Sequence, residues 1–182
     1  MTEQQIIDGC RAQKYRAQKQ LYRQHSPLMM GLCMRYAANR DVAEDILQDG
    51  FAKVFQKFDS FKEDGPLGAW IRRVILNTAL QHYRDTKNLR MHVQIDTTHE
   101  VSSDFDDAIS ILSVEELRSK IQRLPDGCRL VFNLYAIEGY KHKEIADQMD
   151  ISSGTSKSQY SRARSLLQQM IQTEEQISGQ AI

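Results

Sequence analysis

The stretch Trp70–Arg84 reads WIRRVILNTALQHYR, and its pattern guides the interpretation of the whole chain. At about 3.6 residues per turn it predicts a helix with two distinct faces. One face is mostly apolar and consists of Leu67, Ile71, Val74, Ile75, Thr78 and His82. The opposite face has Trp70 at its edge and consists of Arg73, Asn77, Leu80 and Arg84.

The side chains of this second face suit nucleic acid. Arginine binds phosphate, asparagine binds a base edge, and an aromatic ring stacks on an unpaired base. Surface helices usually mix both signs of charge, whereas this stretch has no carboxylate before Asp85. A solvated face that happens to be basic is the alternative, and the rest of the chain distinguishes the two.

Composition predicts an all-α protein. The chain has 182 residues, of which 41% are hydrophobic and 26% charged, as is typical of globular proteins. It contains only nine Gly and three Pro, alternating strand-like runs are almost absent, and segments with helical periodicity dominate. The length suits one large domain or two small ones.

The formal net charge is zero, but the charges occur in blocks. Residues 1–90 hold 15 Lys and Arg against 10 Asp and Glu, residues 91–117 hold none against 7, and residues 118–182 hold 9 against 7. Electrostatic fields act over about 8 Å in physiological salt, so local blocks matter more than the total. The pattern predicts domains at 1–90 and 113–173, an acidic linker at 91–112 and a tail at 174–182.

We expect no metal, cofactor or catalytic site. The three cysteines, Cys10, Cys33 and Cys128, are widely spaced and form no CxxC pair, which argues against zinc and against disulfides. The five histidines are scattered, without the partners that an enzyme requires. No stretch approaches the roughly 18 apolar residues of a membrane span, so a cytoplasmic protein is expected.

The N-terminal residues predict two helices separated at a proline. The first runs from about Glu3 to Arg23 and is interrupted at Pro27, where Ser26 can cap a second helix that continues to about Ala38. The second helix is expected to turn inward the residues Leu28, Leu32, Cys33 and Tyr36.

Asp41 is predicted to cap a third helix, DVAEDILQDGFAKVFQKF. Its apolar positions are Ala43, Ile46, Leu47, Phe51, Val54 and Phe58. Its other face carries four carboxylates and one amide, from Asp41, Glu44, Asp45, Gln48 and Asp49. Such an acidic face either keeps the helix soluble or docks a basic partner. A loop at residues 59–68 then leads into the helix that contains Trp70.

The C-terminal residues predict two further helices before the next motif. Ser113 and Glu116 have the spacing of a capping box for a helix that runs to about Leu124. Residues 125–127 turn the chain, and a second helix covers residues 129–137 before Glu138 and Gly139 stop it.

A helix-turn-helix motif is predicted next. A short helix turns Ile145, Ala146 and Met149 inward, a polar turn covers 150–154, and Thr155 opens a longer helix. The longer helix is expected to bury Tyr160, Ala163, Leu167 and Met170. Its other positions offer donors without a carboxylate, as the major groove requires, and include Lys157, Ser158, Gln159, Ser161, Arg162 and Arg164. An ordinary helical hairpin with one basic face is the alternative.

These motifs together resemble the sigma-70 family of RNA polymerase sigma factors. DVAEDILQDGFAKVFQKF followed by GAWIRRVILNTALQHYR resembles the family's second conserved region. LPDGCRLVFNLYAIEGYKHKEIADQMDISSGTSKSQYSRARSLL resembles its fourth region, and nothing between them looks like the third. This layout is similar to that of the extracytoplasmic-function (ECF) sigma factors, and the resemblance covers about Ile6 to Leu167.

The resemblance implies a sigma factor that binds core RNA polymerase and directs promoter recognition, DNA melting and transcription initiation. It assigns the acidic face of the third helix to polymerase and the acidic linker to the polymerase's RNA path. It assigns the unwound minus-ten element to Lys62, Trp70, Arg73, Asn77 and Arg84, and the Gly-Pro loop before this helix could form a pocket for a flipped base. It assigns the duplex minus-thirty-five element to Thr155, Lys157, Ser158, Gln159, Arg162 and Arg164. Within this set we expect Lys157, Ser158, Gln159 and Arg162 to read bases from the outward arc of the helix. We expect Thr155, with its hydroxyl and the free backbone N–H groups at the helix start, and Arg164 to hold phosphates. An anti-sigma factor is a further possible partner.

The chain departs from the family pattern at two positions. Gln81 stands where many relatives have Asp. Ser156 stands where many have an aliphatic residue, so looser packing of the recognition helix is expected there, with Tyr160 in compensation.

A free-standing helix-turn-helix regulator is the alternative function. It would explain residues 118–173 but neither the acidic helix nor the Trp70 helix, and only a sigma factor would co-purify with core polymerase.

Overall fold

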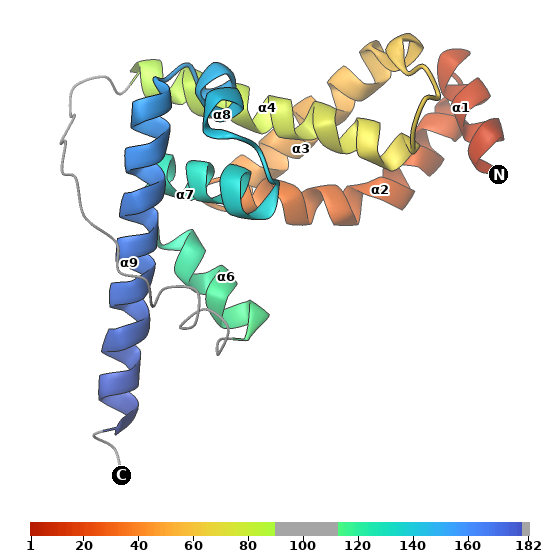
Figure 1. Cartoon of the computed structure of the whole chain (residues 1–182). Coiled ribbons are helices and arrows are strands. Elements are labelled where there is room, and N and C mark those ends of the chain that lie inside the picture. Colours follow the sequence, from red (N-terminus) through yellow and green to blue (C-terminus); the bar gives the residue numbers. More distant parts are fainter. Residues whose placement is uncertain (90–112, 180–182) are drawn as a thin grey trace. The chain divides into compact units, whose positions relative to one another are not determined.

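The computed structural model describes residues 1–89 and 113–179 (Figure 1). In these ranges the chain forms eight α-helices, one 3-10 helix and one π-helix, with no strand, which confirms the all-α fold class. It divides into two compact units, Met1–Arg90 and Met91–Ile182. The predicted linker at 91–112 lies outside the described residues.

The N-terminal unit is a helical bundle with its core between three long helices. Its elements are α1 (Glu3–Arg11), α2 (Tyr15–Tyr36), α3 (Arg40–Gln56), η1 (Phe58–Ser60) and α4 (Leu67–Leu89). Helices α2, α3 and α4 pack against one another, and α1 packs on α2 (Figure 1). Fully buried side chains from each long helix, such as Leu21, Ile46 and Ile71, meet in this core.

The prediction of one helix over residues 3–23, interrupted at Pro27, was wrong. The chain breaks earlier, at Gln13, whose φ of 53° ends α1, and α2 then continues through Pro27. A proline inside a helix leaves the carbonyl four residues earlier without its partner. Here both Pro27 and Arg23 are exposed, so water can hydrate that carbonyl. The inward face of α2 also differs from the prediction, because Leu28 is 71% exposed and Met29 is buried in its place.

Helix α3 buries the residues that its sequence predicts, but its cap differs. All six predicted apolar positions are buried, with Phe58 contributed by η1. The N-cap is Asn39 rather than Asp41, because the Asn39 side-chain oxygen accepts a hydrogen bond from the Val42 N–H at 3.0 Å. Asp41 therefore lies in the first turn, where its negative charge interacts favourably with the positive end of the helix dipole.

Helix α4 begins at Leu67, where the sequence predicts it, but buries a wider arc. Leu80, which was placed on the exposed face, is only 2% exposed, and Leu76 and Ala79 are buried beside it. Because α4 packs against both α2 and α3, two directions of the helix face apolar neighbours. Its exposed stripe is correspondingly narrow.

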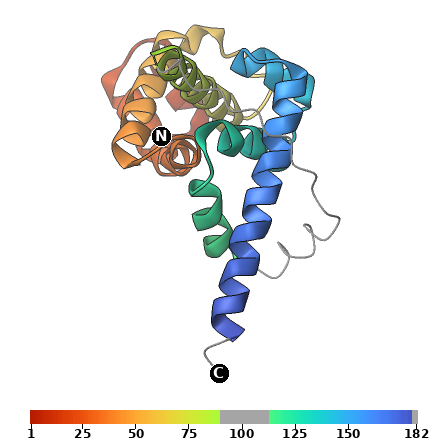
Figure 2. The same ribbon diagram turned by 90° about the vertical axis from the view of Figure 1, so that its left-hand side faces the viewer.

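The C-terminal unit is built around one long helix. Its elements are α6 (Val114–Gln122), α7 (Asp126–Phe132), η2 (Asn133–Ile137), α8 (His142–Met149) and α9 (Ser153–Gly179). Both views show α6 beside α9 (Figure 1 and Figure 2). The core beneath them consists of Ile121, Leu124, Cys128, Phe132, Ala163 and Leu167.

The capping box is confirmed, but two other boundaries in this unit differ from the sequence prediction. Ser113 and Glu116 exchange both hydrogen bonds of the box. Helix α7 starts at Asp126 directly after Pro125, so the predicted turn at 125–127 is shorter, and the π-helix η2 continues it to Ile137. Gly139 ends this segment with a φ of 77°, a conformation that favours glycine.

Helix α9 begins two residues before Thr155. Ser152 is positioned as its cap, because the Ser152 hydroxyl oxygen accepts a hydrogen bond from the Thr155 N–H at 2.9 Å. Asp150, with a φ of 54°, ends α8 and makes the tight turn. Helices α8 and α9 with this turn form the predicted helix-turn-helix. Ile145, Ala146, Met149, Ala163 and Leu167 are buried as expected, whereas Tyr160 and Met170 are only partly buried against the core.

Candidate nucleic-acid interface

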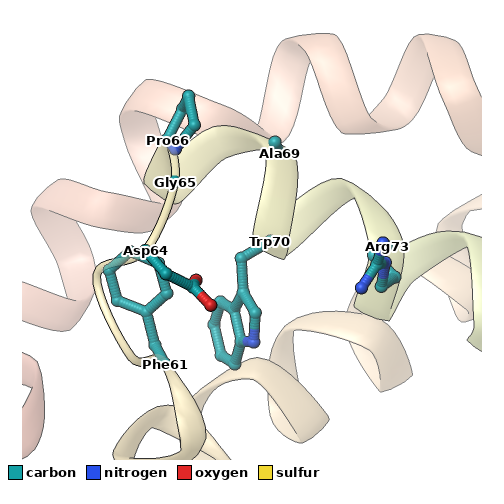
Figure 3. A pocket seen from close by; sticks show the side chains of 7 residues that line it. All are labelled: Phe61, Asp64, Gly65, Pro66, Ala69, Trp70 and Arg73. Carbon is teal, nitrogen blue, oxygen red and sulfur yellow. The ribbon is translucent and has the colours of Figure 1, made fainter.

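A pocket lies where the loop at residues 61–66 meets the first turn of α4 (Figure 3). It is open to solvent, has a volume of about 190 Å³ and is lined by Phe61, Asp64, Gly65, Pro66, Ala69, Trp70 and Arg73. The indole ring of Trp70 lies beside Phe61 and the Asp64 carboxylate, and Arg73 lies one turn further along α4. The Gly-Pro loop thus forms a pocket where the sequence suggests one.

Trp70 is held in this pocket by other aromatic rings. Its ring centroid lies 5.7 Å from that of Phe58 and 5.4 Å from that of Phe61, and both phenylalanines are buried. Trp70 itself is half-buried. The ring is therefore fixed at one edge and accessible at another, which suits stacking of an incoming planar group.

The predicted minus-ten residues occupy different surroundings. Arg73 and Asn77 are exposed one turn apart on α4, and Lys62 is exposed in the loop but does not line the pocket. Arg84 is partly buried and donates a hydrogen bond to the Gln81 side-chain oxygen at 2.5 Å. The Gln81 amide nitrogen in turn donates to Asp85 at 2.7 Å. The structure thus brings Trp70, Arg73 and Asn77 together and places Arg84 in a separate hydrogen-bonded group.

The acidic face of α3 is a continuous surface, but it includes a cation that sequence reasoning missed. Asp41, Asp45, Gln48 and Asp49 are all exposed along one side of the helix. Arg40 pairs with the fifth member, Glu44, with 2.8 Å between Nε and Oε1. The four-residue spacing of Arg40 and Glu44 was the signal that could have revealed this pair.

The predicted base-reading residues of α9 do not all point outward. Lys157 is exposed, and Ser158 is half-buried with its hydroxyl donating to the Thr155 carbonyl at 3.0 Å. Gln159 faces α7 instead, because its side-chain oxygen accepts a hydrogen bond from the Cys128 thiol at 2.9 Å. Placing Gln159 on the outward arc was wrong. Arg162 is half-buried, and its charge lies near enough to the buried Cys128 to interact with the thiol.

The two predicted phosphate contacts of α9 also differ from expectation. The Thr155 N–H donates a hydrogen bond to the Ser152 hydroxyl, so it is not the free N–H that was expected at the helix start. The Ser152 and Thr155 hydroxyl groups lie 2.8 Å apart. The Arg164 guanidinium carbon lies 6.0 Å from the centroid of the Tyr160 ring. Arg164 therefore packs along the helix surface as well as carrying charge.

Ser156 connects the two helices of the helix-turn-helix. It is fully buried, and its hydroxyl lies 2.9 Å from Nδ1 of His142 at the start of α8. His142 stacks on Tyr135 with ring centroids 4.3 Å apart, and Tyr135 lies 4.5 Å from Tyr160. A hydrogen bond and an aromatic cluster thus take the place of the aliphatic side chain of the family pattern, and Tyr160 is part of that cluster, as predicted.

This arrangement predicts that acidification destabilises the C-terminal unit. Burial, with a contribution from Lys157, lowers the pKa of His142 below its usual value near 6.5. As pH falls through about 6.5, the unfolded chain binds a proton that the folded chain resists, so stability is present above that pH and is lost below it. We expect the melting temperature of the chain to be lower at about pH 5.5 than at about pH 8.

A His142→Gln variant should lose part of this pH dependence. Burial also lowers the pKa of His25, so a remainder with the same sign stays in the variant. His82→Gln removes a histidine elsewhere and serves as the control. Identical pH dependence in the wild type and in His142→Gln would show that His142 does not contribute.

The described residues hold no obvious metal site. Among residues 1–89 and 113–179, no three His, Cys, Asp or Glu side chains are grouped so that they could bind a metal ion. All three cysteines are buried free thiols, and burial raises the pKa of Cys10 to about 11 and that of Cys33 to about 12. No helix in the described part of the chain is both long and apolar enough to cross a membrane.

Comparison with protein-family models gives two matches in the expected order. The Sigma-70 region 2 model matches residues 21–89, and the Sigma-70, region 4 model matches residues 114–167. The chain belongs to the sigma-70 family. Its relatives place this sigma factor in the ECF type. The ECF RNA polymerase sigma-E factor of Haemophilus influenzae is 25% identical, covering 94% of this chain and 96% of the relative.

A second relative and a solved structure are also similar to this chain. The RNA polymerase sigma-H factor of Pseudomonas aeruginosa is also 25% identical, covering 93% of this sigma factor and 94% of the relative. The crystal structure of the sigma factor RpoE with the anti-sigma factor NepR from Bartonella quintana has a TM-score of 0.50 and 23% identity. It covers 85% of this chain and 96% of that one, and it supports the fold.

The family matches also locate the candidate site within this sigma factor. The region 2 match contains the acidic face, the pocket loop and α4, whereas α1 lies before it. The region 4 match contains α8 and the first half of α9, which is the helix-turn-helix.

Proposed function

We propose that this sigma factor docks on core RNA polymerase through the acidic face of α3 and opens promoters by capturing an unpaired base in the pocket beside Trp70. The observation that carries the proposal is the pocket itself. One aromatic ring is fixed there between a loop and a helix, beside the exposed Arg73 and Asn77. The test is promoter-directed transcription by core polymerase supplied with this chain.

The pocket offers both kinds of interaction that a flipped base needs. Stacking of a base on an aromatic ring contributes about 1–3 kcal/mol and depends little on sequence. The Asp64 carboxylate can accept a hydrogen bond from a base, and the Arg73 guanidinium can donate to a base or to its phosphate. A base that has left the duplex would therefore be held by its face and by its edge.

Helix α9 is proposed to read the upstream duplex element. Its first turns enter the groove, with Lys157, Ser158 and Arg162 as base contacts and Arg164 and the Thr155 hydroxyl as phosphate contacts. The buried Ser156 fixes this helix against α8, which contacts the backbone in helix-turn-helix proteins. Gln159 is left out of the reading set because its amide oxygen is bound to Cys128.

Removing a base contact of α9 should have a different effect on DNA binding from removing a phosphate contact. Arg162→Ala should cost about 1–3 kcal/mol and relax the preference at one position of the upstream element. Arg164→Ala should weaken all sequences alike and reduce the salt slope by about one unit. The measurement is binding of the full chain with core polymerase to promoters randomised upstream, at several salt concentrations.

Two controls make this comparison decisive. The Arg164→Ala protein needs a melting curve, because that side chain also packs on Tyr160. Gln159→Ala is expected to leave sequence preference unchanged. An Arg162→Ala protein with the wild-type preference would remove Arg162 from the reading set.

The partners and location follow from this role. The Bartonella quintana relative was solved with an anti-sigma factor, and we propose that a partner of this class also regulates this chain. A sigma factor acts where polymerase and promoters are found, which is the cytoplasm. It contributes binding and DNA distortion, while the polymerase performs the chemistry, so the chain is proposed to be non-catalytic.

A further inference from the structure

An arginine outside the region 2 match holds the loop that forms the pocket. Arg11 is the last residue of α1, and its Nη2 donates a hydrogen bond to the Phe61 carbonyl oxygen at 3.0 Å. Its Nη1 lies 2.6 Å from Oε1 of Glu63. Phe61 lines the pocket and Glu63 precedes the lining residue Asp64, so one guanidinium binds the pocket loop at two points.

The loop needs this support because its own conformation is unfavourable. Glu63 has a φ of 58°, in the left-handed region that residues with a Cβ atom rarely adopt. Residues 62–66 are exposed, so little apolar packing fixes them. A strained backbone persists only where surrounding contacts determine it. Arg11 makes such contacts through both of its terminal nitrogens. The side chains of Arg11 and Glu63 are each only about one-third exposed.

Helix α1 is in turn fixed on the bundle, so Arg11 has a defined position. Ile6, Ile7 and Cys10 are buried. Gly9 lies so close to α2 that a Cβ atom at this position would be 2.4 Å from the Ala17 Cβ. The guanidinium therefore extends from a rigid helix across to the pocket loop. The backbone of this loop lies beside α1 in Figure 1.

We infer that Arg11 is a positioning residue for the base pocket, acting through Phe61 and Glu63. It holds the pocket wall in the conformation that leaves Trp70 accessible on one side only. It also neutralises the Glu63 carboxylate, which would otherwise repel the phosphates of DNA entering the pocket. This inference rests on the proposed function for its effect on promoters, but not for its effect on the pocket.

The effect on the pocket can be measured without polymerase or DNA, because Trp70 is the single tryptophan of the chain. Quenching of its fluorescence by acrylamide reports how accessible the pocket is. Arg11→Ala should increase this quenching, and Arg11→Lys, which keeps the charge near Glu63, should restore part of the protection. Arg16→Ala removes an exposed arginine on the neighbouring helix and should have no effect.

A second variant separates the loop contact from the folding of α1. Glu63→Gln removes the ion pair while leaving α1 and the bond to Phe61 in place. It should give a smaller increase in quenching than Arg11→Ala, at an unchanged helix content. Wild-type quenching in both Arg11→Ala and Glu63→Gln would overturn the inference.

Promoter opening by the full chain with core polymerase then tests the functional consequence. Arg11→Ala should lower initiation on duplex promoters about two- to fivefold, the factor expected from loss of one part-buried ion pair, with less loss on pre-melted templates. If quenching changes while both Arg11→Ala and Trp70→Ala initiate normally, the pocket does not capture a base. The proposed function of the pocket then fails, and Arg11 remains the residue that positions the loop.

Discussion

Replacing Asp45 by Arg and Gln48 by Ala is expected to abolish co-purification of this sigma factor with core RNA polymerase. Both side chains are exposed at the centre of the acidic face of α3. Truncating one partner of a buried, hydrogen-bonded charge contact costs about 2–5 kcal/mol, and reversing the charge adds repulsion. Affinity should therefore fall at least about thirtyfold. The measurement is pull-down of core polymerase by the tagged chain.

Helix α1 offers a matched control for this double variant. Gln4→Ala with Asp8→Arg also truncates one exposed amide and reverses one exposed carboxylate, at the cost of one surface hydrogen bond. This control should bind polymerase as the wild type does. Wild-type affinity in the Asp45→Arg and Gln48→Ala protein would show that the acidic face only keeps α3 soluble.

Replacing Trp70 by Ala is expected to lower initiation on duplex promoters by about fivefold to more than a hundredfold. This range corresponds to the 1–3 kcal/mol or so that stacking of one base contributes. A template with a pre-melted bubble should recover much of the loss, because strand separation no longer depends on capture of the base. Polymerase binding should be unchanged, since Trp70 lies on α4 and the acidic face is on α3.

Trp70 also packs on Phe58 and Phe61, so its variants must separate stacking on DNA from packing in the protein. Trp70→Leu keeps an apolar contact with both rings but cannot stack on a base, whereas Trp70→Phe keeps an aromatic ring. Initiation should fail with Leu and recover in part with Phe. Arg73→Ala removes an exposed side chain at the pocket and should lower opening without lowering stability. Equal losses on duplex and bubble templates would instead make Trp70 a packing residue.

Sequence periodicity predicted the helices that have one clear apolar stripe. The six apolar positions of the third helix are all buried, and the Ser113 capping box has the predicted hydrogen bonds. These features depend on contacts within a few residues, which spacing records directly. The pocket loop was predictable for the same reason, because Gly65 and Pro66 interrupt the chain directly before α4.

The features that were missed depend on neighbours far along the chain. Whether Pro27 ends a helix depends on whether the carbonyl it leaves unpaired can reach water. Leu80 is buried because α4 has two packing partners, and Gln159 turns inward because Cys128 lies opposite it. The contact between Arg11 and the pocket loop joins residues 50 positions apart, so no local pattern could indicate it.

The most direct test is transcription by core polymerase, with and without this chain, from a promoter library randomised at both elements. We expect start sites that depend on the chain and two enriched sequence blocks. The downstream block should lose its information in Trp70→Leu and Arg73→Ala, and the upstream block in Arg162→Ala. Start sites identical to those of core polymerase alone, or enriched blocks that none of these variants alters, would contradict the proposed roles of the pocket and of α9.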